Sequence, residues 1–351
     1  MTVRLPFLSL LAATILLSFS APSALVAQPS AISVQPSALS VSASRVTAHA
    51  SLVRAAAASQ EPQSQHVDFI TPHISDGYEM DLPYWKAPFA YEVCLGRKVE
   101  GKCGPLWDPV TIGSRSIQLS PTKHVVMLFL AAAICVLVLV GGARAHVRDT
   151  AAAGHPKGAA NGIEATVLYL RNEVILPTVG AHGERYVPYL LTVFFFILFA
   201  NLLGLIPYGA TATGNISVTA TLALVSFIVI EISGIVALGP GYLSTIFYWN
   251  KDLGIFLRVV LFLIMTPVEI MSKLTKPFAL AIRLFANMVS GHIVVLAFIG
   301  LIFTFGALAG LAPFAMAVGI MLLELLVAFL QAFIFTLLTS SFIGQIREAA
   351  H

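Results

Sequence analysis

The chain has 351 residues, of which 58% are hydrophobic and 11% are charged, and its mean hydropathy is +0.88. These values exclude an ordinary soluble domain and indicate a membrane protein. The net charge is only +3 and no Lys- or Arg-rich run occurs, so the sequence argues against a nucleic-acid partner.

The first 27 residues predict a targeting segment. Arg4 precedes a short apolar run, and small residues lead up to Ala27, as in a secretory signal peptide. No Asp or Glu occurs before Glu61, and the leader is rich in Ser and Ala, so an organellar transit peptide is the alternative.

Residues 28–120 predict an extracytoplasmic N-terminal region with little regular structure. Residues 28–60 are rich in Ala, Ser and Val and lack a periodic apolar face. Cys94 and Cys103 flank the segment LGRKVEGK. In an exported region these cysteines could form a disulfide that closes a small loop, and two free thiols are the alternative.

Residues 121–351 predict a membrane channel domain, and the fold class is an all-α polytopic membrane protein. Apolar runs long enough to cross a bilayer cover residues 124–142, 189–206 and 216–238. Between the first two runs, apolar residues recur at helical spacing from Ile163 to Ile175 and predict an amphipathic surface helix that ends near Pro177.

The distribution of basic residues predicts the orientation. Arg144, Arg148 and Lys157 follow the first span, whereas the turn at residues 207–214 carries no charge. Basic loops face the cytoplasm, so we expect the first connection inside and the turn outside. The N-terminus is then extracytoplasmic, and the C-terminus is cytoplasmic.

The last two membrane helices are too long to cross the bilayer perpendicularly. Residues 253–305 are almost continuously apolar, and a final helix is expected over residues 314–343. The first of these segments must be broken at Pro267 or Pro277, steeply tilted, or both. We therefore expect five membrane helices, the last two forming a long, steeply tilted hairpin.

An intramembrane arginine is the most informative residue of the chain. Arg283 lies in the apolar stretch LAIRLFANMVSGH, where it costs about 2.5–3.5 kcal/mol at mid-membrane. On an ideal helix it shares one face with four other polar residues, Glu269, Ser272, Lys276 and Asn287. Such a stripe predicts a functional path; a buried bridge that only fixes the fold is the alternative.

Three further polar residues belong to the predicted site. Glu324 and Gln331 are seven residues apart and share a face of the last helix. We expect His292 to pair with Glu324, since either can carry a proton, and Gln331 to accept from the Arg283 guanidinium. Ordinary interhelical hydrogen bonds are the alternative for His292 and Asn287, and snorkelling to the interface is the alternative for Lys273 and Lys276.

The segment TPVEIMSKLTKPFALAIRLFANMVSGH, followed by LQAFIFTLL, closely resembles subunit a of F-type ATP synthases, and the resemblance extends over roughly residues 121–345. It implies a stator channel beside a rotating ring of c subunits. Arg283 would separate two proton half-channels. The residues implied at the extracytoplasmic half-channel are Asn287, His292, Glu324 and Gln331, and those at the cytoplasmic one are Glu269, Ser272 and Lys276.

The sequence departs from this family at the outer mouth of the channel. Lys123 and His124 stand where some relatives have an acidic residue, and Gly204 stands where some have Asp. The resemblance therefore does not identify the residues that admit protons from outside.

The resemblance also implies the partners, which are the c-ring, subunit b of the peripheral stalk, the remaining Fo and F1 subunits and the lipid bilayer. It implies no cofactor on this chain, and the absence of a Walker-type glycine loop leaves nucleotide chemistry to other subunits. The expected location is the bacterial inner membrane, with the mitochondrial inner membrane as the alternative. A proton-coupled secondary transporter is the alternative function, although it predicts repeated halves that the sequence lacks. Proton and sodium both remain open as the coupling ion.

Overall fold

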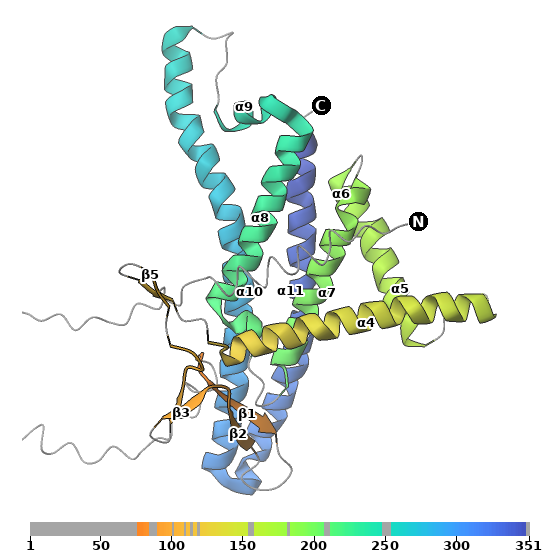
Figure 1. Cartoon of the computed structure of the whole chain (residues 1–351), viewed down its shortest axis with the longest axis vertical. Coiled ribbons are helices and arrows are strands. Elements are labelled where there is room, and N and C mark those ends of the chain that lie inside the picture. Colours follow the sequence, from red (N-terminus) through yellow and green to blue (C-terminus); the bar gives the residue numbers. More distant parts are fainter. Residues whose placement is uncertain are drawn as a thin grey trace, which may run out of the picture.

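The computed structural model describes residues 76–83, 90–99, 102–108, 110–112, 115–117, 120–153, 158–180, 183–206, 211–247 and 254–348. The predicted targeting segment lies outside these residues. Long helices dominate the molecule, and they confirm the predicted all-α membrane fold (Figure 1).

Five helices are long and apolar enough to cross a membrane. They are α4 (Lys123–Ala153), α7 (Val187–Gly204), α8 (Ile216–Leu238), α10 (Ile255–Ala309) and α11 (Leu311–Glu348). Each contains or closely matches a predicted span, and α8 has the predicted bounds. The short helices between them are α5 (Ala159–Tyr169), η2 (Leu170–Ile175), α6 (Leu176–Val179), η3 (Gly183–Arg185), η4 (Ala212–Gly214), η5 (Gly239–Gly241) and α9 (Tyr242–Ile246).

The predicted amphipathic helix corresponds to α5, η2 and α6, which follow one another without a break. Leu170, Val174, Ile175 and Val179 are buried on one side of this segment, as the spacing requires. Pro177 lies two residues before the end of this helical segment at Val179, close to the predicted end.

The N-terminal region is more regular than predicted. Three antiparallel hairpins pair β1 (Glu79–Pro83) with β2 (Ala90–Cys94), β3 (Arg97–Val99) with β4 (Lys102–Gly104), and β5 (Val110–Ile112) with β6 (Arg115–Ile117). Polar and apolar residues alternate in Glu-Met-Asp-Leu of β1, which is the pattern of a strand. The structure joins Cys94 to Cys103 as a disulfide, with the Cα atoms 5.8 Å apart, so β2 is linked to β4.

The core lies around α7, which is apolar on all sides. Leu190, Phe194 and Ile197 are fully buried, and helices α4 and α11 pack against α7. The ring of Phe194 meets that of Phe329 on α11 edge to face at 5.6 Å. A helix that is apolar all round requires neighbours on every side, and α7 has them.

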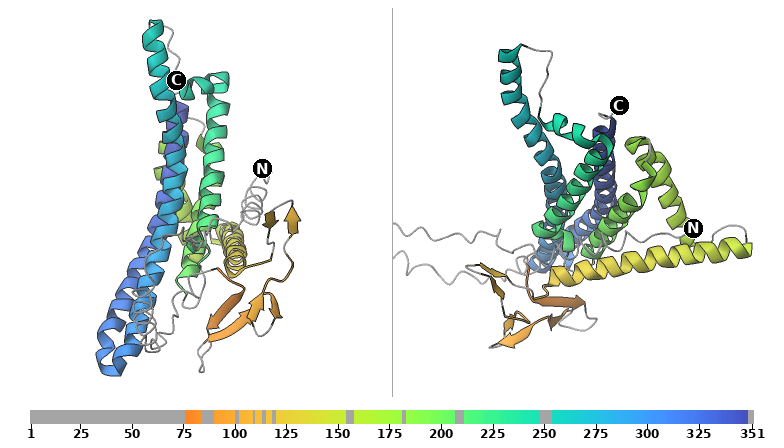
Figure 2. Two further views of the ribbon diagram at one scale, coloured as in Figure 1. Left: turned by 90° about the vertical axis from the view of Figure 1, so that its left-hand side faces the viewer. Right: turned by 45° about the horizontal axis from the view of Figure 1, so that its top comes forward.

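Helices α10 and α11 form the expected long hairpin. The sequence allowed a break at Pro267 or Pro277, a steep tilt, or both; no break is observed, because α10 runs through both prolines for 55 residues, about 82 Å. Each proline removes a single backbone hydrogen-bond donor from α10. The packing of α10 against α8 and α11 stabilises the helix in spite of this loss. Figures 1 and 2 show that α10 bends along its length, as proline-containing helices do. Both figures also show α4 lying across the hairpin at a steep angle.

Candidate functional site

Arg283 lies in the middle of α10, with an exposed side chain. In the described part of the chain its guanidinium makes no hydrogen bond or ion pair. The expected bond from Arg283 to Gln331 is therefore absent among the described residues, and Oε1 of Gln331 accepts from Asn287 of α10. The charge of Arg283 is left available on the outer face of the hairpin.

A pocket of about 380 Å³ lies on the N-terminal side of Arg283, between α10 and α11. The side chains that line it include Ser272, Lys276 and Arg283, together with Phe342 of α11. The Lys276 ammonium lies 4.8 Å from the centre of the Phe342 ring, a distance at which a cation and an aromatic face attract each other. Lys276 is thus held inside the pocket by α11 and does not simply reach for the membrane interface.

A second, smaller pocket of about 140 Å³ lies on the C-terminal side of Arg283, and its walls include Asn287, Ser290, Gly291 and Glu324. The side-chain amide of Asn287 donates to Oε1 of Gln331 across 2.9 Å. Glu324 is 5% exposed, and within the described residues its Oε1 has no hydrogen-bond partner. This pocket therefore combines a buried carboxyl group with Asn287, whose hydrogen bond to Gln331 joins α10 to α11.

The pairing of His292 with Glu324 stays a prediction. Gly291, the residue before His292, faces Glu324 directly, and a Cβ atom at Gly291 would lie only 2.7 Å from Oε1 of Glu324. The pairing was expected because both groups can carry a proton, whereas the residue of α10 that faces Glu324 is the one before His292. The structure thus brings Asn287, Glu324 and Gln331 together and leaves His292 outside this group.

Glu269 lies in neither pocket, and its neighbourhood contains a cluster that the sequence did not predict. Lys273, one turn later, donates to the hydroxyl of Tyr242 at 2.5 Å and lies 3.6 Å from the carboxylate of Glu231. Tyr242 in turn donates to Glu231. The side chain of Lys273 is therefore 11% exposed and paired with Glu231, and the alternative that it snorkels to the interface stays a prediction.

This cluster connects α8, α9 and α10. Burial raises the pKa of Tyr242, and it is the largest cause. The hydrogen bond to Glu231 and the negative charge of that carboxylate raise this pKa further. The tyrosine hydroxyl consequently keeps its proton and remains a donor to Glu231.

Sequence reasoning also missed a buried polar chain near the 207–214 turn. Thr211 and Thr213 share a hydrogen bond of 3.0 Å between their hydroxyls, and Thr213 donates to Asn201 at 2.8 Å. Asn201 then donates to the carbonyl of Ala328 on α11 at 3.3 Å. The usable signal was the group of uncharged polar residues in NLLGLIPYGATATGN, namely Asn201, Thr211, Thr213 and Asn215.

The family model described as "ATP synthase A chain" matches residues 125–344, which include both pockets, Arg283 and the buried polar chain. The chain belongs to the ATP synthase A chain family. It is therefore a membrane subunit of an F-type ATP synthase and takes part in ATP synthesis and proton transport. The matched segment starts after the strands of the N-terminal region, so the family assignment rests on the helices.

Named relatives in this family come from bacteria. "ATP synthase subunit a 2" of Chlorobaculum tepidum is 49% identical over 230 residues, which cover 65% of this chain and 63% of that protein. "ATP synthase subunit a" of Chloroherpeton thalassium is 44% identical over 276 residues, covering 78% and 74%. The Myxococcus xanthus protein of the same name is 43% identical over 297 residues, covering 82% and 91%. These relatives and the five apolar helices make the chain a multi-pass bacterial membrane protein.

Proposed function

We propose that the chain is the stator part of the proton path in a rotary ATP synthase, with two half-channels that meet at Arg283. The observation that carries this proposal is the pair of separate pockets on the two sides of Arg283 along α10. Protons would reach the ring of c subunits through one pocket and leave through the other.

Arg283 suits the boundary between two proton paths because a guanidinium is always charged and never delivers a proton. A ring carboxyl that faces lipid must be protonated, since a bare charge there is prohibitive. Near Arg283 the ionised form of that carboxyl is favoured, so it releases its proton. The exposure of Arg283 and its lack of partners in the described residues support such an encounter with a neighbouring subunit.

The two pockets differ in chemistry as two half-channels would. Glu324 supplies a buried ionisable group on one side, and the amides of Asn287 and Gln331 fix the two helices beside it. Lys276 and Ser272 line the other side. We assign the Glu324 pocket to the extracytoplasmic half-channel, with His292 as an outlying member. We assign the Lys276 pocket to the cytoplasmic half-channel, with Glu269 as an outlying member.

The proposed orientation places the start of α4 and the 211–215 turn outside the cell. The basic residues Arg144 and Arg148 at the other end of α4 favour the cytoplasm. If α4 crosses the membrane along its normal, the hairpin of α10 and α11, which lies across it, is steeply tilted (Figure 1). Such a tilt also lets a helix of about 82 Å fit a hydrocarbon core of roughly 30 Å.

The proposal is tested in complete ATP synthase reconstituted in vesicles, with Arg283→Ala and Arg283→Lys. We expect both variants to lose ATP-driven proton pumping and ATP synthesis, because neither keeps the planar, permanently charged group. Arg144→Ala removes an exposed arginine of α4 and is the matched control, which we expect to retain coupled transport. Normal coupled transport in both Arg283 variants would overturn the proposal.

A further inference from the structure

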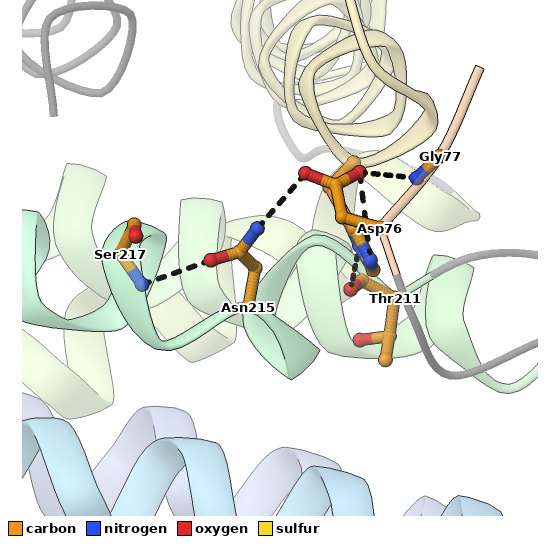
Figure 3. Close-up of polar contacts among 6 residues, drawn as sticks. Asp76, Gly77, Thr211, Asn215 and Ser217 are labelled. Atoms are coloured by element: carbon orange, nitrogen blue, oxygen red, sulfur yellow. Dashed lines mark hydrogen bonds and ion pairs between the residues drawn. The ribbon is translucent and has the colours of Figure 1, made fainter. Parts of the chain in front are cut away.

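A polar cluster lies where the residue 76–77 segment meets the start of α4 and the 211–215 turn (Figure 3). One carboxylate oxygen of Asp76 accepts from the backbone N–H of Gly77 at 3.0 Å, and the other accepts from Asn215 at 3.2 Å. Asn215 also caps α8, because its side chain accepts from the Ser217 N–H at 2.9 Å. Asp76 is therefore held in place, although its side chain is 36% exposed.

The ring of His124 lies against this carboxylate and is almost completely buried, with 3% of the side chain exposed. Its Nδ1 atom is 2.8 Å from the backbone carbonyl of Thr211. A carbonyl can only accept, so Nδ1 carries a hydrogen. The other ring nitrogen, Nε2, is 3.9 Å from Oδ1 of Asp76.

This geometry creates a place for one more proton. In a neutral His124 with hydrogen on Nδ1, the lone pair of Nε2 faces the Asp76 carboxylate. An added proton on either group replaces this repulsive contact with an attractive one. Among the described residues, the neighbouring charged or titratable groups include Lys123, next to His124, and Tyr78, whose pKa is raised by burial and by the charge of Asp76. The 211–215 turn contributes only neutral side chains.

The cluster is also the outer end of the buried polar chain. From Thr211 the hydrogen bonds pass through Thr213 and Asn201 to the carbonyl of Ala328. Ala328 lies about one helical turn from both Glu324 and Gln331 on α11. Thr213 and Asn201 are fully buried, so this chain is a polar path through an otherwise apolar interior.

We propose that Asp76 and His124 form a proton-loading site at the extracytoplasmic entrance to the Glu324 pocket. The site rests on the function proposed above and adds to it two residues outside the segment that the family model matches. It also gives a physical role to the N-terminal region: Asp76 supplies, from a distant part of the chain, an acidic group at the start of the first membrane helix.

A purely structural latch is the rival interpretation, since the same contacts attach the residue 76–77 segment to α4 and α8. A latch acts through the hydrogen bonds of Asp76 with Gly77 and Asn215, whose donors do not titrate in the pH range of histidine. The proton-loading site does depend on the pH of the extracytoplasmic side. The dependence of ATP synthesis on that pH therefore separates the two.

The test uses complete ATP synthase in vesicles whose lumen corresponds to the extracytoplasmic side. Initial rates of ATP synthesis are measured at luminal pH 5.5–8.5, from about one unit below to about two units above the ordinary histidine pKa, with constant external pH and a constant potassium diffusion potential. The variants are Asp76→Asn and His124→Gln, with Asp76→Glu as the conservative change. Asn215→Ser is the matched control, because it removes the contact with Asp76, keeps a helix-capping residue and leaves both ionisable groups in place.

We expect Asp76→Asn and His124→Gln to lower the luminal pH of half-maximal synthesis by about one unit, the size of effect expected when one charge partner is removed. Asp76→Glu and Asn215→Ser should keep the wild-type profile. Assembly is judged by carbodiimide-sensitive ATP hydrolysis. If either Asp76→Asn or His124→Gln fails to assemble, the pH profile of the other variant tests the proposal. An unchanged pH profile in the assembled variants would overturn the proposal and leave a latch. Arg283→Ala is measured alongside: if it loses synthesis while the profiles are unchanged, only the loading site fails, and if it retains synthesis, the proposed function fails as well.

Discussion

Asn287 of α10 and Gln331 of α11 are joined by a hydrogen bond of 2.9 Å, one helical turn beyond Arg283. Gln331 is 4% exposed, whereas Asn287 lies on the exposed face of α10. The bond therefore sits at the seam of the hairpin, between the buried side and the side that carries Arg283. It fixes how α11 is placed relative to Arg283 without touching the guanidinium.

This bond predicts non-additive effects of substitution. Asn287→Ala and Gln331→Ala should each reduce ATP-driven proton pumping, and the double variant should be no worse than the poorer single one. We expect a coupling of about 1 kcal/mol, corresponding to roughly a fivefold difference in rate, because each single change leaves the other amide without its partner. Pumping rates of the four proteins at equal amounts of assembled enzyme provide the measurement. Fully multiplicative losses would mean that the two amides act separately.

Gly291 allows α10 to approach Glu324 closely, so Gly291→Ala should block the smaller pocket. The added Cβ would lie 2.7 Å from Oε1 and 2.9 Å from Cδ of Glu324, closer than unstrained contacts. We expect passive proton conduction through the membrane sector to fall by about tenfold, equivalent to about 1.4 kcal/mol.

Two comparisons test whether this effect is local. A second change, Glu324→Asp, shortens the side chain and should restore part of the conduction lost in Gly291→Ala. Gly319→Ala on α11 is the matched control, since its added Cβ meets nothing within 4 Å. Equal losses in the two alanine variants would show that the effect comes from helix propensity and not from the contact with Glu324.

The sequence predicted the helices well because long apolar runs leave few alternatives in a membrane. The bounds of α8 were predicted to the residue, and Arg283 stands on the same helix as its predicted stripe. The sequence was less informative about contacts between helices. Periodicity gives the face of a residue, but not the height at which two helices meet, so the sequence did not show that Gly291 faces Glu324.

Contacts between distant segments were the part that the sequence could not supply. Asp76 and His124 are separated by 48 positions, and nothing in either local pattern relates them. The short strands of the N-terminal region were missed for a similar reason. Hairpins of three to five residues per strand are only marginally stable alone, so their local signal is weak, and pairing depends on surroundings such as the link between β2 and β4.

The disulfide between Cys94 and Cys103 gives a test of the proposed orientation. An exported disulfide stays oxidised, whereas a cytoplasmic cysteine pair is kept reduced. In intact cells, a membrane-impermeant maleimide should label Cys94 and Cys103 only after treatment with an impermeant reductant. Cys135, which is buried in α4, is the internal control and should stay unlabelled. Peptide mass spectrometry reads all three sites, and labelling of the pair without reductant would contradict an oxidised, exported hairpin.

The cluster of Lys273, Glu231 and Tyr242 should matter for assembly more than for the proton path itself. Lys273 and Glu231 are 11% and 20% exposed, so removing one charge leaves the other in a mostly desolvated place. We expect Lys273→Met to destabilise the junction of α8, α9 and α10 by about 2 kcal/mol, less than the roughly 3–5 kcal/mol for a fully buried pair. The additional change Glu231→Gln should restore most of the loss, because the unmatched carboxylate is then gone. Tyr242→Phe, which keeps both charges, should have the smallest effect. The amount of enzyme assembled in membranes and its thermal inactivation measure this order, and a double variant less stable than Lys273→Met would show that the carboxylate is not the source of the loss.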